Sequence, residues 1–308
     1  MNIVNQATML FLSALAAAIG FRMNLFNIGV EGQYLVASYA AAVLAGAAFF
    51  PGALNTVVAV LVAMAVGSAW AGIAGVLKVT RGVSEVISTI MLNAIGLTLV
   101  GYLLNRYGLQ LGNSRRTPVI PEGSRVPGWY PFLERDGAIW GLVLLAVLAG
   151  IGFNLLLNRT RFGFDLRATG MSQTAAVTSG VKVRRMVVVS MMLSGALAGL
   201  VWMPALFGAA YSYGTTFQAG LGFAGIAVAL LGRNRPLGIM FGALLFAFLN
   251  EQSNRLTLET DISANVVLIT QGVIVLAVVV AYEVVRRYRI AAEQRAVRAR
   301  ADAEAVRA

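Results

Sequence analysis

Long stretches without a charged side chain constrain this chain more than any other feature of its sequence. No Asp, Glu, Lys or Arg occurs in residues 137–158, 186–232, 236–250 or 262–282. A helix needs about 20 apolar residues to cross a hydrocarbon core roughly 30 Å thick. Only 12 % of the residues are charged, whereas a soluble domain carries about 25%. The sequence therefore predicts an all-α, polytopic integral membrane protein.

Eight to nine helical spans are expected, since the apolar runs are rich in Ala, Leu and Gly and do not alternate as membrane barrel strands do. We place them at residues 5–22, 27–49, 54–77, 85–104, 139–157 and 185–207, at a broken pair 223–231 and 236–250, and at 264–285. Residues 1–288 then form one transmembrane domain with a loop at 158–185. Residues 289–308 form a basic cytoplasmic tail, interpreted as a solvated helix near anionic headgroups rather than a specific partner site.

Basic residues indicate the orientation of these spans, because Lys and Arg are enriched in cytoplasmic loops. With a cytoplasmic C-terminus, 18 of the 24 Lys and Arg residues fall on the inner side, and the other six are matched by six acids. The net charge of +11 therefore reflects membrane topology rather than nucleic-acid binding. The same parity places the N-terminus outside, so we expect the natural chain to begin one span earlier.

The residues that the chain lacks argue against catalysis. It has no cysteine and no histidine, which removes thiolate chemistry and the commonest general base and metal ligand. It also has no G-x-x-x-x-G-K-[ST] loop for ATP. Gly220, Gly222 and Gly225 spell G-x-G-x-x-G without a βαβ pattern around them, so we expect them to allow close packing of a short half-helix. We expect no catalytic residue, no metal and no cofactor.

Polar residues at membrane depth mark a first candidate site. One group lies in FNIGVEGQYL, residues 26–35; the other is a stripe on one face of the predicted helix after residue 84, formed by residues 85, 88, 89 and 93. An unpaired acid is costly in hydrocarbon, so such residues face the bundle or a wet cavity. The residues predicted to line a substrate path are Asn27, Glu31, Gln33, Ser88 and Asn93. For Glu31, a structural hydrogen-bond node between helices is the alternative.

The loop NRTRFGFDLRATGMSQTAAVTSGVKVRR, residues 158–185, is a second candidate site. It is long enough for a short amphipathic helix along the inner membrane face, with Gly170 and Gly180 as its stops. Such a helix suits the docking of a partner, and an ordinary charged connector is the alternative. In the next span, Gly195 and Gly199 are expected to allow a close helix crossing.

Four segments, FNIGVEGQYLVASYAAAV, SEVISTIMLN, GFDLRATGMSQTAAVTSGV and GFAGIAVALLG, resemble the permease subunits of bacterial ABC importers for branched-chain amino acids, ribose and nucleosides. The likeness is greatest to the nucleoside-type permeases, whose relatives carry one more N-terminal span. It implies a type II ABC importer-like permease in the bacterial plasma membrane. Its partners would be cytoplasmic ATPase subunits, a second permease subunit in a heterodimer, and an external lipoprotein that binds a purine or related nucleoside. By this likeness, the ATPase is contacted by Asp165, Arg167, Gly170, Ala175, Ala176 and Gly180.

Three classes of function remain open from the sequence: an ATP-driven permease, a proton-coupled carrier and a membrane-embedded enzyme. We favour a permease subunit that is not itself an enzyme and is driven by ATP hydrolysis in partner chains, with ribose or other simple sugars as the alternative substrate. A secondary carrier that takes up a proton on Glu31 is a second class. A membrane-embedded transferase using Glu31 and Glu85 is a third, disfavoured by the missing His and Cys.

Overall fold

The computed structural model describes residues 2–130, 137–259, 266–278, 280–281, 284 and 287–288. Its helices are α1 (Asn2–Arg22), α2 (Val30–Ala47), α3 (Gly52–Arg81), α4 (Glu85–Tyr107), α5 (Val143–Arg159), α6 (Arg161–Met171), α7 (Gln173–Thr178), α8 (Val183–Gly199), α9 (Met203–Ala205), α10 (Leu221–Leu231) and α11 (Pro236–Glu259). Short elements are strands β1 (Leu109–Leu111) and β2 (Ser114–Arg116), the 3₁₀ turn η1 (Glu122–Ser124) and the π-helix η3 (Leu206–Ala210). Contacts divide the chain into two compact units, Met1–Gln252 and Ser253–Ala308.

Helices occupy the positions where spans were predicted, so the all-α class is confirmed. Within the described residues, four helical stretches are long and apolar enough to cross a membrane: α1, α3, α4 and Val183–Ala210. Counting the pair α5 and α6, bent by 72°, as one span makes up to five. The shorter α2 carries Glu31 and Gln33 in its first turn, which lowers its hydropathy. The number of eight to nine spans stays a prediction.

The second unit contains the end of α11 and the apolar helix Val266–Val278, which falls within the span predicted at 264–285. The basic tail predicted at 289–308 lies outside the described residues.

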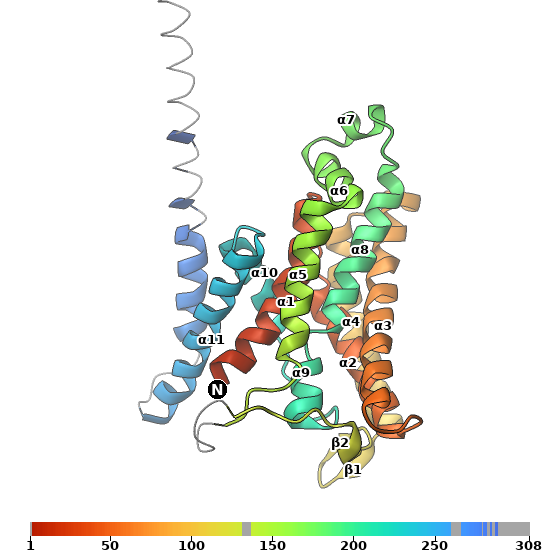
Figure 1. The fold of residues 1–308 in the computed structure, drawn as a ribbon, viewed down its shortest axis with the longest axis vertical. Helices are drawn as coiled ribbons and strands as arrows, with labels where there is room; N and C mark the ends of the chain where they lie inside the picture. The colour runs from red at the N-terminus through yellow and green to blue at the C-terminus, as the bar shows by residue number, and fades with distance from the viewer. Residues whose placement is uncertain are drawn as a thin grey trace, which may run out of the picture. The chain divides into compact units, whose positions relative to one another are not determined.

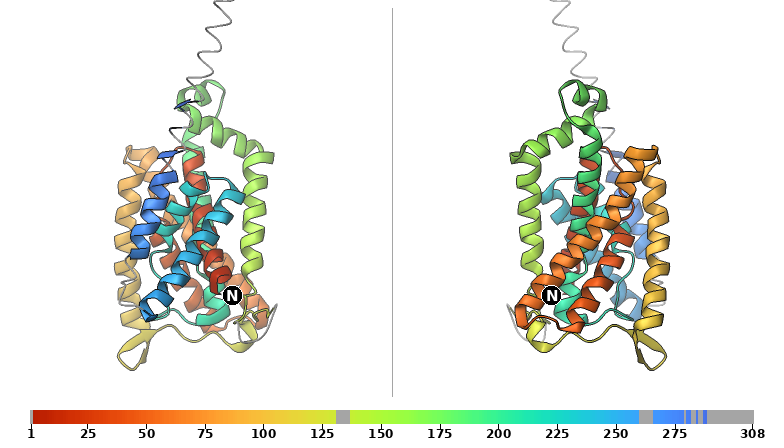
Figure 2. Two further views of the ribbon diagram at one scale, coloured as in Figure 1. Left: turned by 90° about the vertical axis from the view of Figure 1, so that its left-hand side faces the viewer. Right: turned by 90° about the vertical axis from the view of Figure 1, so that its right-hand side faces the viewer.

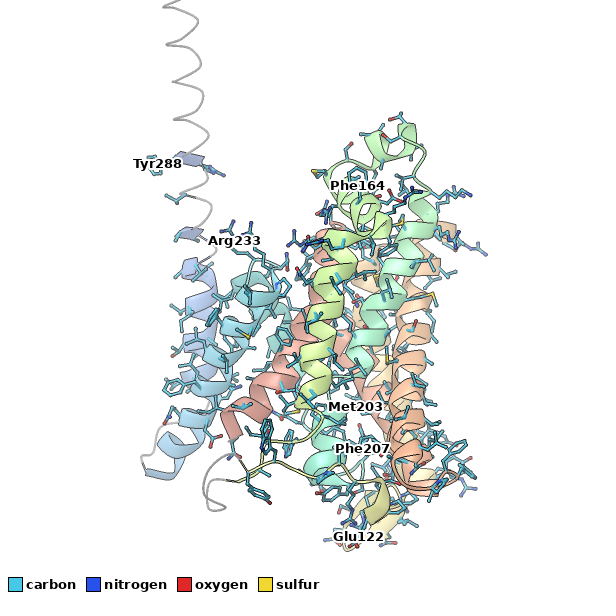
Figure 3. All side chains as sticks on the ribbon, in the orientation of Figure 1. Glu122, Phe164, Met203, Phe207, Arg233 and Tyr288 are labelled. Carbon is cyan, nitrogen blue, oxygen red and sulfur yellow. The ribbon has the colours of Figure 1, made fainter. Side chains whose placement is uncertain are left out.

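A small β-hairpin in the loop after α4 departs from the all-α prediction. Its strands pair antiparallel, with Leu109 opposite Arg116. Figure 1 shows this hairpin at one end of the first unit and helices α6 and α7 at the other. Glu122 lies at the hairpin end, whereas Phe164 lies at the α6 end (Figure 3). The loops predicted to lie on opposite sides of the membrane are thus at opposite ends of the first unit, and which end faces the cytoplasm stays a prediction.

Glycines bring α3 and α8 into direct backbone contact where the two helices cross (Figure 2, right). A Cβ added to Gly195 would lie 2.1 Å from the carbonyl oxygen of Gly67, and one added to Gly199 would lie 2.2 Å from that of Ala63. No side chain fits at these positions, so small residues set the separation of the two helices. The predicted close crossing at Gly195 and Gly199 is confirmed.

The predicted broken pair at 223–231 and 236–250 is confirmed as α10 and α11. The span predicted at 185–207 lies within the apolar stretch Val183–Ala210, but this stretch contains an interruption that was not predicted. The helix predicted to run from 185 to 207 ends at Gly199, and α9 and η3 continue the chain. Pro204, in α9, has no amide hydrogen for a helical bond. The π-helix then ends at Tyr211, which has the left-handed φ of 52°. Such π-turns are frequent at functional sites.

The loop at 158–185 folds into two helices instead of the one predicted. Thr160 and Ser172 cap the starts of α6 and α7, each accepting a hydrogen bond from the backbone amide three residues later, at 3.1 and 3.3 Å. Helix α6 continues through Gly170 to Met171, so the prediction that Gly170 stops the helix is wrong. Gly180, with a φ of +84°, follows α7 at the position predicted for the second stop.

Candidate functional site

A buried amide pair joins the start of α2 to α1 and α8. Asn27 Nδ2 donates to Gln33 Oε1 at 3.0 Å, and Gln33 Nε2 donates to Asn27 Oδ1 at 2.9 Å. Asn27 Nδ2 also donates at 2.7 Å to the hydroxyl of Ser194 on α8, which in turn donates to the carbonyl of Ala16 on α1 at 2.6 Å. All three side chains are buried. Because buried polar groups are costly when unpaired, this network specifies how the three helices meet.

Asn93 on α4 holds the same helix start from the other side. Its Oδ1 accepts the amide of Gly32 at 2.8 Å, and its Nδ2 donates to the carbonyl of Ile28 at 3.0 Å. A Cβ on Gly32 would lie 2.8 Å from the Cα of Asn93, so this glycine lets the two backbones approach. Backbone groups left free at membrane depth need a protein partner, and Asn93 supplies it here.

The carboxylate of Glu31 caps the N-terminus of the half-helix α10. Its Oε1 accepts the amide of Gly220 at 2.7 Å, and its Oε2 accepts the amide of Gly222 at 2.8 Å. The hydroxyl of Tyr34 donates to Oε1 at 3.0 Å. A helix N-terminus has unpaired amides and a positive dipole end, so a carboxylate is favoured there. Of the two interpretations that the sequence left open, the hydrogen-bond node matches this geometry.

Small residues allow α10 to reach this carboxylate. A Cβ on Gly222 would lie 2.4 Å from the backbone nitrogen of Glu31, and one on Gly225 would lie 2.0 Å from the hydroxyl oxygen of Ser13 on α1. Ser13 donates to the carbonyl of Leu221 at 2.8 Å. The close packing predicted for this glycine-rich half-helix is confirmed.

The polar stripe of α4 faces the bundle, as predicted, but its members have different partners. Glu85, Ser88 and Thr89 are all buried. Glu85 forms an ion pair with Lys78 of α3. Ser88, in contrast, donates to the carbonyl of Ser84 on its own helix at 3.0 Å. The stripe therefore joins α4 to its neighbours through Glu85 and Asn93, and not through Ser88.

The five residues predicted to line a substrate path fall into three groups. Asn27, Gln33 and Asn93 surround the start of α2, Glu31 faces α10, and Ser88 bonds within α4. Each has a protein partner in this conformation. Asn27, Glu31, Gln33 and Asn93 have the geometry of side chains that hold the starts of α2 and α10 in place, whereas Ser88 does not.

Sequence reasoning missed Tyr34 and Ser194, which bond to Glu31 and Asn27 respectively. It also missed Ser13 and Arg22, which donate to backbone carbonyls in or just after the half-helix α10. Each is a polar or amphipathic side chain within an apolar helix or at its end. A lone polar residue in a membrane span requires a hydrogen-bond partner inside the protein, so its presence alone could have marked each of these positions as a contact between helices. Which partner each one finds depends on helix packing that the sequence does not display.

An aromatic cluster lies beside Glu31 and links two helix breaks. The ring of Phe217, just before α10, stacks on Tyr34 with centroids 5.4 Å apart. It also meets Trp202 at 5.0 Å and Tyr213 at 4.7 Å. Trp202 stands in the break between α8 and α9, so the rings pack the end of α8 against the entry to α10.

The residues predicted to contact an ATPase lie on or beside α6 and α7. Asp165, Arg167 and Gly170 belong to α6, Ala175 and Ala176 to α7, and Gly180 follows α7. Ala175 is exposed, whereas Ala176 is buried. Arg167 turns back onto its own chain: its Nη1 donates to the carbonyl of Leu157 and, at 3.3 Å, to Asn158 Oδ1. Arg167 therefore caps the C-terminal end of α5.

Apolar side chains project from the same two helices. Phe164 is 64 % exposed, Val177 59 % and Met171 84 %. Phe164 lines a groove of ≈ 800 Å³ between α6 and the start of α8, and the lining also includes Asp165 and Arg185. An exposed apolar surface rimmed by charges is typical of a protein-binding site.

The first unit is thus a helical membrane bundle in which buried polar groups hold the helix breaks and a short helical pair exposes an apolar surface at one end. Discontinuous helices at membrane depth are typical of membrane transport proteins. Residues 1–282 match the family described as branched-chain amino acid transport system / permease component, and the chain belongs to this family.

Named relatives agree with this assignment. The chain is 37% identical over 287 residues to the guanosine ABC transporter permease protein NupP of Bacillus subtilis, covering 91% of this chain and 81% of that protein. It is 32% identical over 250 residues to the nucleoside ABC transporter permease protein NupB of Lactococcus lactis, covering 78% and 68%. It is 28% identical over 305 residues to the glucose ABC transporter permease protein TsgB13 of Haloferax volcanii, covering 94% and 78%.

These similarities confirm the expected family and the expected class, a permease subunit rather than an enzyme. The chain is a multi-pass protein of the bacterial membrane.

Proposed function

We propose that this chain is the permease subunit of an ATP-driven importer for nucleosides. The observation that carries the proposal is the match, over most of the chain, to two permeases named for guanosine and nucleoside transport. Simple sugars are the second candidate, because a relative named for glucose also matches over nearly the whole chain. The lower identity to that relative makes nucleosides the first choice.

In this proposal, Asn27, Glu31, Gln33, Ser88 and Asn93 border the solute path. Four of them act by fixing the start of α2 and the N-terminus of α10, the two helix ends that face one another across Glu31. Discontinuous helices of this kind surround solute sites in many transporters. The aromatic cluster of Phe217, Tyr34, Tyr213 and Trp202 lies next to them. Aromatic side chains are the residue type that stacks on nucleobases.

The pair α6–α7 docks on a cytoplasmic ATPase subunit, through the surface that includes Asp165, Arg167, Gly170, Ala175, Ala176 and Gly180. Support comes from the exposed apolar side chains Phe164, Met171 and Val177 and from the charged groove beside them. The C-terminus lies on the same, cytoplasmic side. At the opposite end, near the β-hairpin, an external lipoprotein delivers the solute, and a second permease subunit completes a heterodimer.

Uptake by the reconstituted complex tests the proposal. Proteoliposomes containing this chain and its partner subunits are given radiolabelled guanosine with and without internal ATP, and unlabelled adenosine, ribose and leucine are added as competitors. We expect ATP-dependent uptake that adenosine inhibits and that ribose and leucine do not. Absence of guanosine uptake, together with ATP-dependent uptake of radiolabelled ribose, would assign the chain to sugars. Uptake that continues without ATP and collapses with a protonophore would replace the proposal with a proton-coupled carrier.

A further inference from the structure

The turn between α10 and α11 is held by the last residue of α1. Arg22 donates two hydrogen bonds to the carbonyl oxygen of Asn234, from Nε at 3.1 Å and from Nη2 at 2.9 Å. Arg233 and Asn234 both have a left-handed φ, of 55° and 54°. Non-glycine residues adopt this conformation rarely, and two in succession persist only where surrounding contacts maintain it. Arg22 supplies such a contact.

Helix α6 rests on the same residue of α1. A Cβ on Gly170 would lie 2.5 Å from the carbonyl oxygen of Arg22 and 3.0 Å from the Cα of Met23, so the backbone of α6 touches the end of α1. Met23 is fully buried at this contact. A displacement of α6 therefore acts on the end of α1, and so on Arg22, through this backbone contact.

The opposite end of α10 is held as well. Its N-terminal amides bind the carboxylate of Glu31, and its middle packs on Ser13. A half-helix of 11 residues fixed at both ends moves as one body when either end is displaced.

We infer that Arg22 is a positioning residue that transmits displacement of α6 to the half-helix α10, and through α10 to the Glu31 end of the solute path. This inference rests on the proposed function, since it takes α6 as the element that an ATPase moves. Three contacts make up the route. Gly170 of α6 touches the end of α1, Arg22 donates to Asn234 after α10, and Glu31 accepts the amides at the start of α10.

Spin labels test this route because the chain contains no cysteine. Cysteines are introduced in pairs in a complex whose other subunits lack cysteine: Met171 with Leu61, and Phe223 with Leu61. All three positions are exposed. Electron-spin distances are then compared with and without ATP in the wild-type background and in Arg22→Gln. We expect ATP to change both distances in the wild type. In Arg22→Gln, only the Met171 distance should change.

Transport provides a second readout in the same complexes. Loss of charge-assisted hydrogen bonds of usual strength predicts about tenfold less uptake per ATP hydrolysed in Arg22→Gln. Arg22→Lys keeps the charge and a donor, so it should restore most of the coupling. The matched control is Arg81→Gln, at the exposed end of α3, which should leave both distances and uptake per ATP unchanged.

The outcomes separate the two proposals. A Phe223 distance that responds to ATP equally in Arg22→Gln and the wild type overturns the inference alone. A wild-type complex with no ATP-dependent change at Met171 overturns the proposed function and this inference with it.

If Arg22→Gln does not assemble, Gly170→Ala disturbs the same contact from α6, since its Cβ would overlap the carbonyl of Arg22. It should also lower uptake per ATP, and full coupling in that variant would overturn the inference.

Discussion

Glu31 of α2 and Gly222 of α10 lie in direct contact, with the carboxylate Oε2 accepting the glycine amide at 2.8 Å. Substitution Glu31→Gln replaces one acceptor by an NH₂ group that faces a donor. Hydrogen bonds to charged groups contribute about 1.5–3 kcal/mol, so the thermal unfolding midpoint of the purified complex should fall, and ATP-dependent uptake with it. Thermal unfolding and initial uptake rates measure the two effects.

Glu122→Gln is the matched control for this substitution. The side chain of Glu122 is 90% exposed, and its ion pair with Arg125 spans 3.7 Å. Such surface pairs contribute little, so unfolding and uptake should both stay at the wild-type level. If Glu31→Gln instead raised KM for the solute without changing the unfolding midpoint, direct contact with the solute would replace the capping role.

Asn93→Ala and Ser88→Ala separate two residues that share one stripe of α4. Asn93 satisfies two backbone groups at the start of α2, so its loss leaves an amide and a carbonyl unpaired at membrane depth. We expect Asn93→Ala to destabilise the protein by about 1–3 kcal/mol for each group left unpaired and to abolish most uptake.

Ser88→Ala should have little effect on the unfolding midpoint, because the hydroxyl bonds only within its own helix. An increased KM in Ser88→Ala, with normal stability, would show that this hydroxyl contacts the solute. Equal destabilisation by both substitutions would contradict the role assigned to Asn93.

Gly195→Ala tests the backbone contact between α3 and α8. The new Cβ would lie 2.1 Å from the carbonyl oxygen of Gly67, so the helices must separate. Overpacking of this kind costs about 1–3 kcal/mol, which a lower unfolding midpoint would report. Gly101→Ala, on α4, is the control, because no atom lies within 4 Å of its Cβ position. The control should be neutral or should stabilise the helix by up to about 1 kcal/mol. Equal effects of the two substitutions would show that the helix contact does not limit stability.

Phe164→Ala tests the proposed docking surface of α6 without disturbing the core, since this ring is 64 % exposed. We expect a permease with normal unfolding that retains much less ATPase subunit during purification. Phe241→Ala, on α11 and 66 % exposed, serves as the control and should retain the ATPase fully. Arg167 is a poorer probe than the sequence indicated, because charge reversal there also breaks the cap of α5. Undiminished ATPase binding by Phe164→Ala would remove this surface from the docking site.

The sequence predicted the features that depend on local pattern and on the cost of polar groups in hydrocarbon. The all-α class, the broken helix pair around Arg233 and the inward-facing stripe on α4 are of this kind. Features set by tertiary contact were missed. Gly170 has the residue type of a helix stop, yet it serves a close approach to Arg22. The interruption of the span after Gly199 was also missed, although the close crossing of α3 and α8 at this glycine was predicted.

The partner of Glu31 illustrates the same limit at the site. The acid at membrane depth was recognisable, but the amides that it binds lie 189 and 191 residues further along the chain. Only the packing of α10 against α1 and α2 brings them together.

The backbone contact between α3 and α8 has a consequence for attempts to change the solute preference of this protein. No side chain lies between the two helices at this crossing, so any larger residue introduced there would force them apart. Most variants in a mutant library directed at the crossing would therefore misassemble. The segment between η3 and α10 is a better target for randomisation. Thr215 and Thr216 are exposed within it, next to the rings, and new side chains there would meet no packed neighbour.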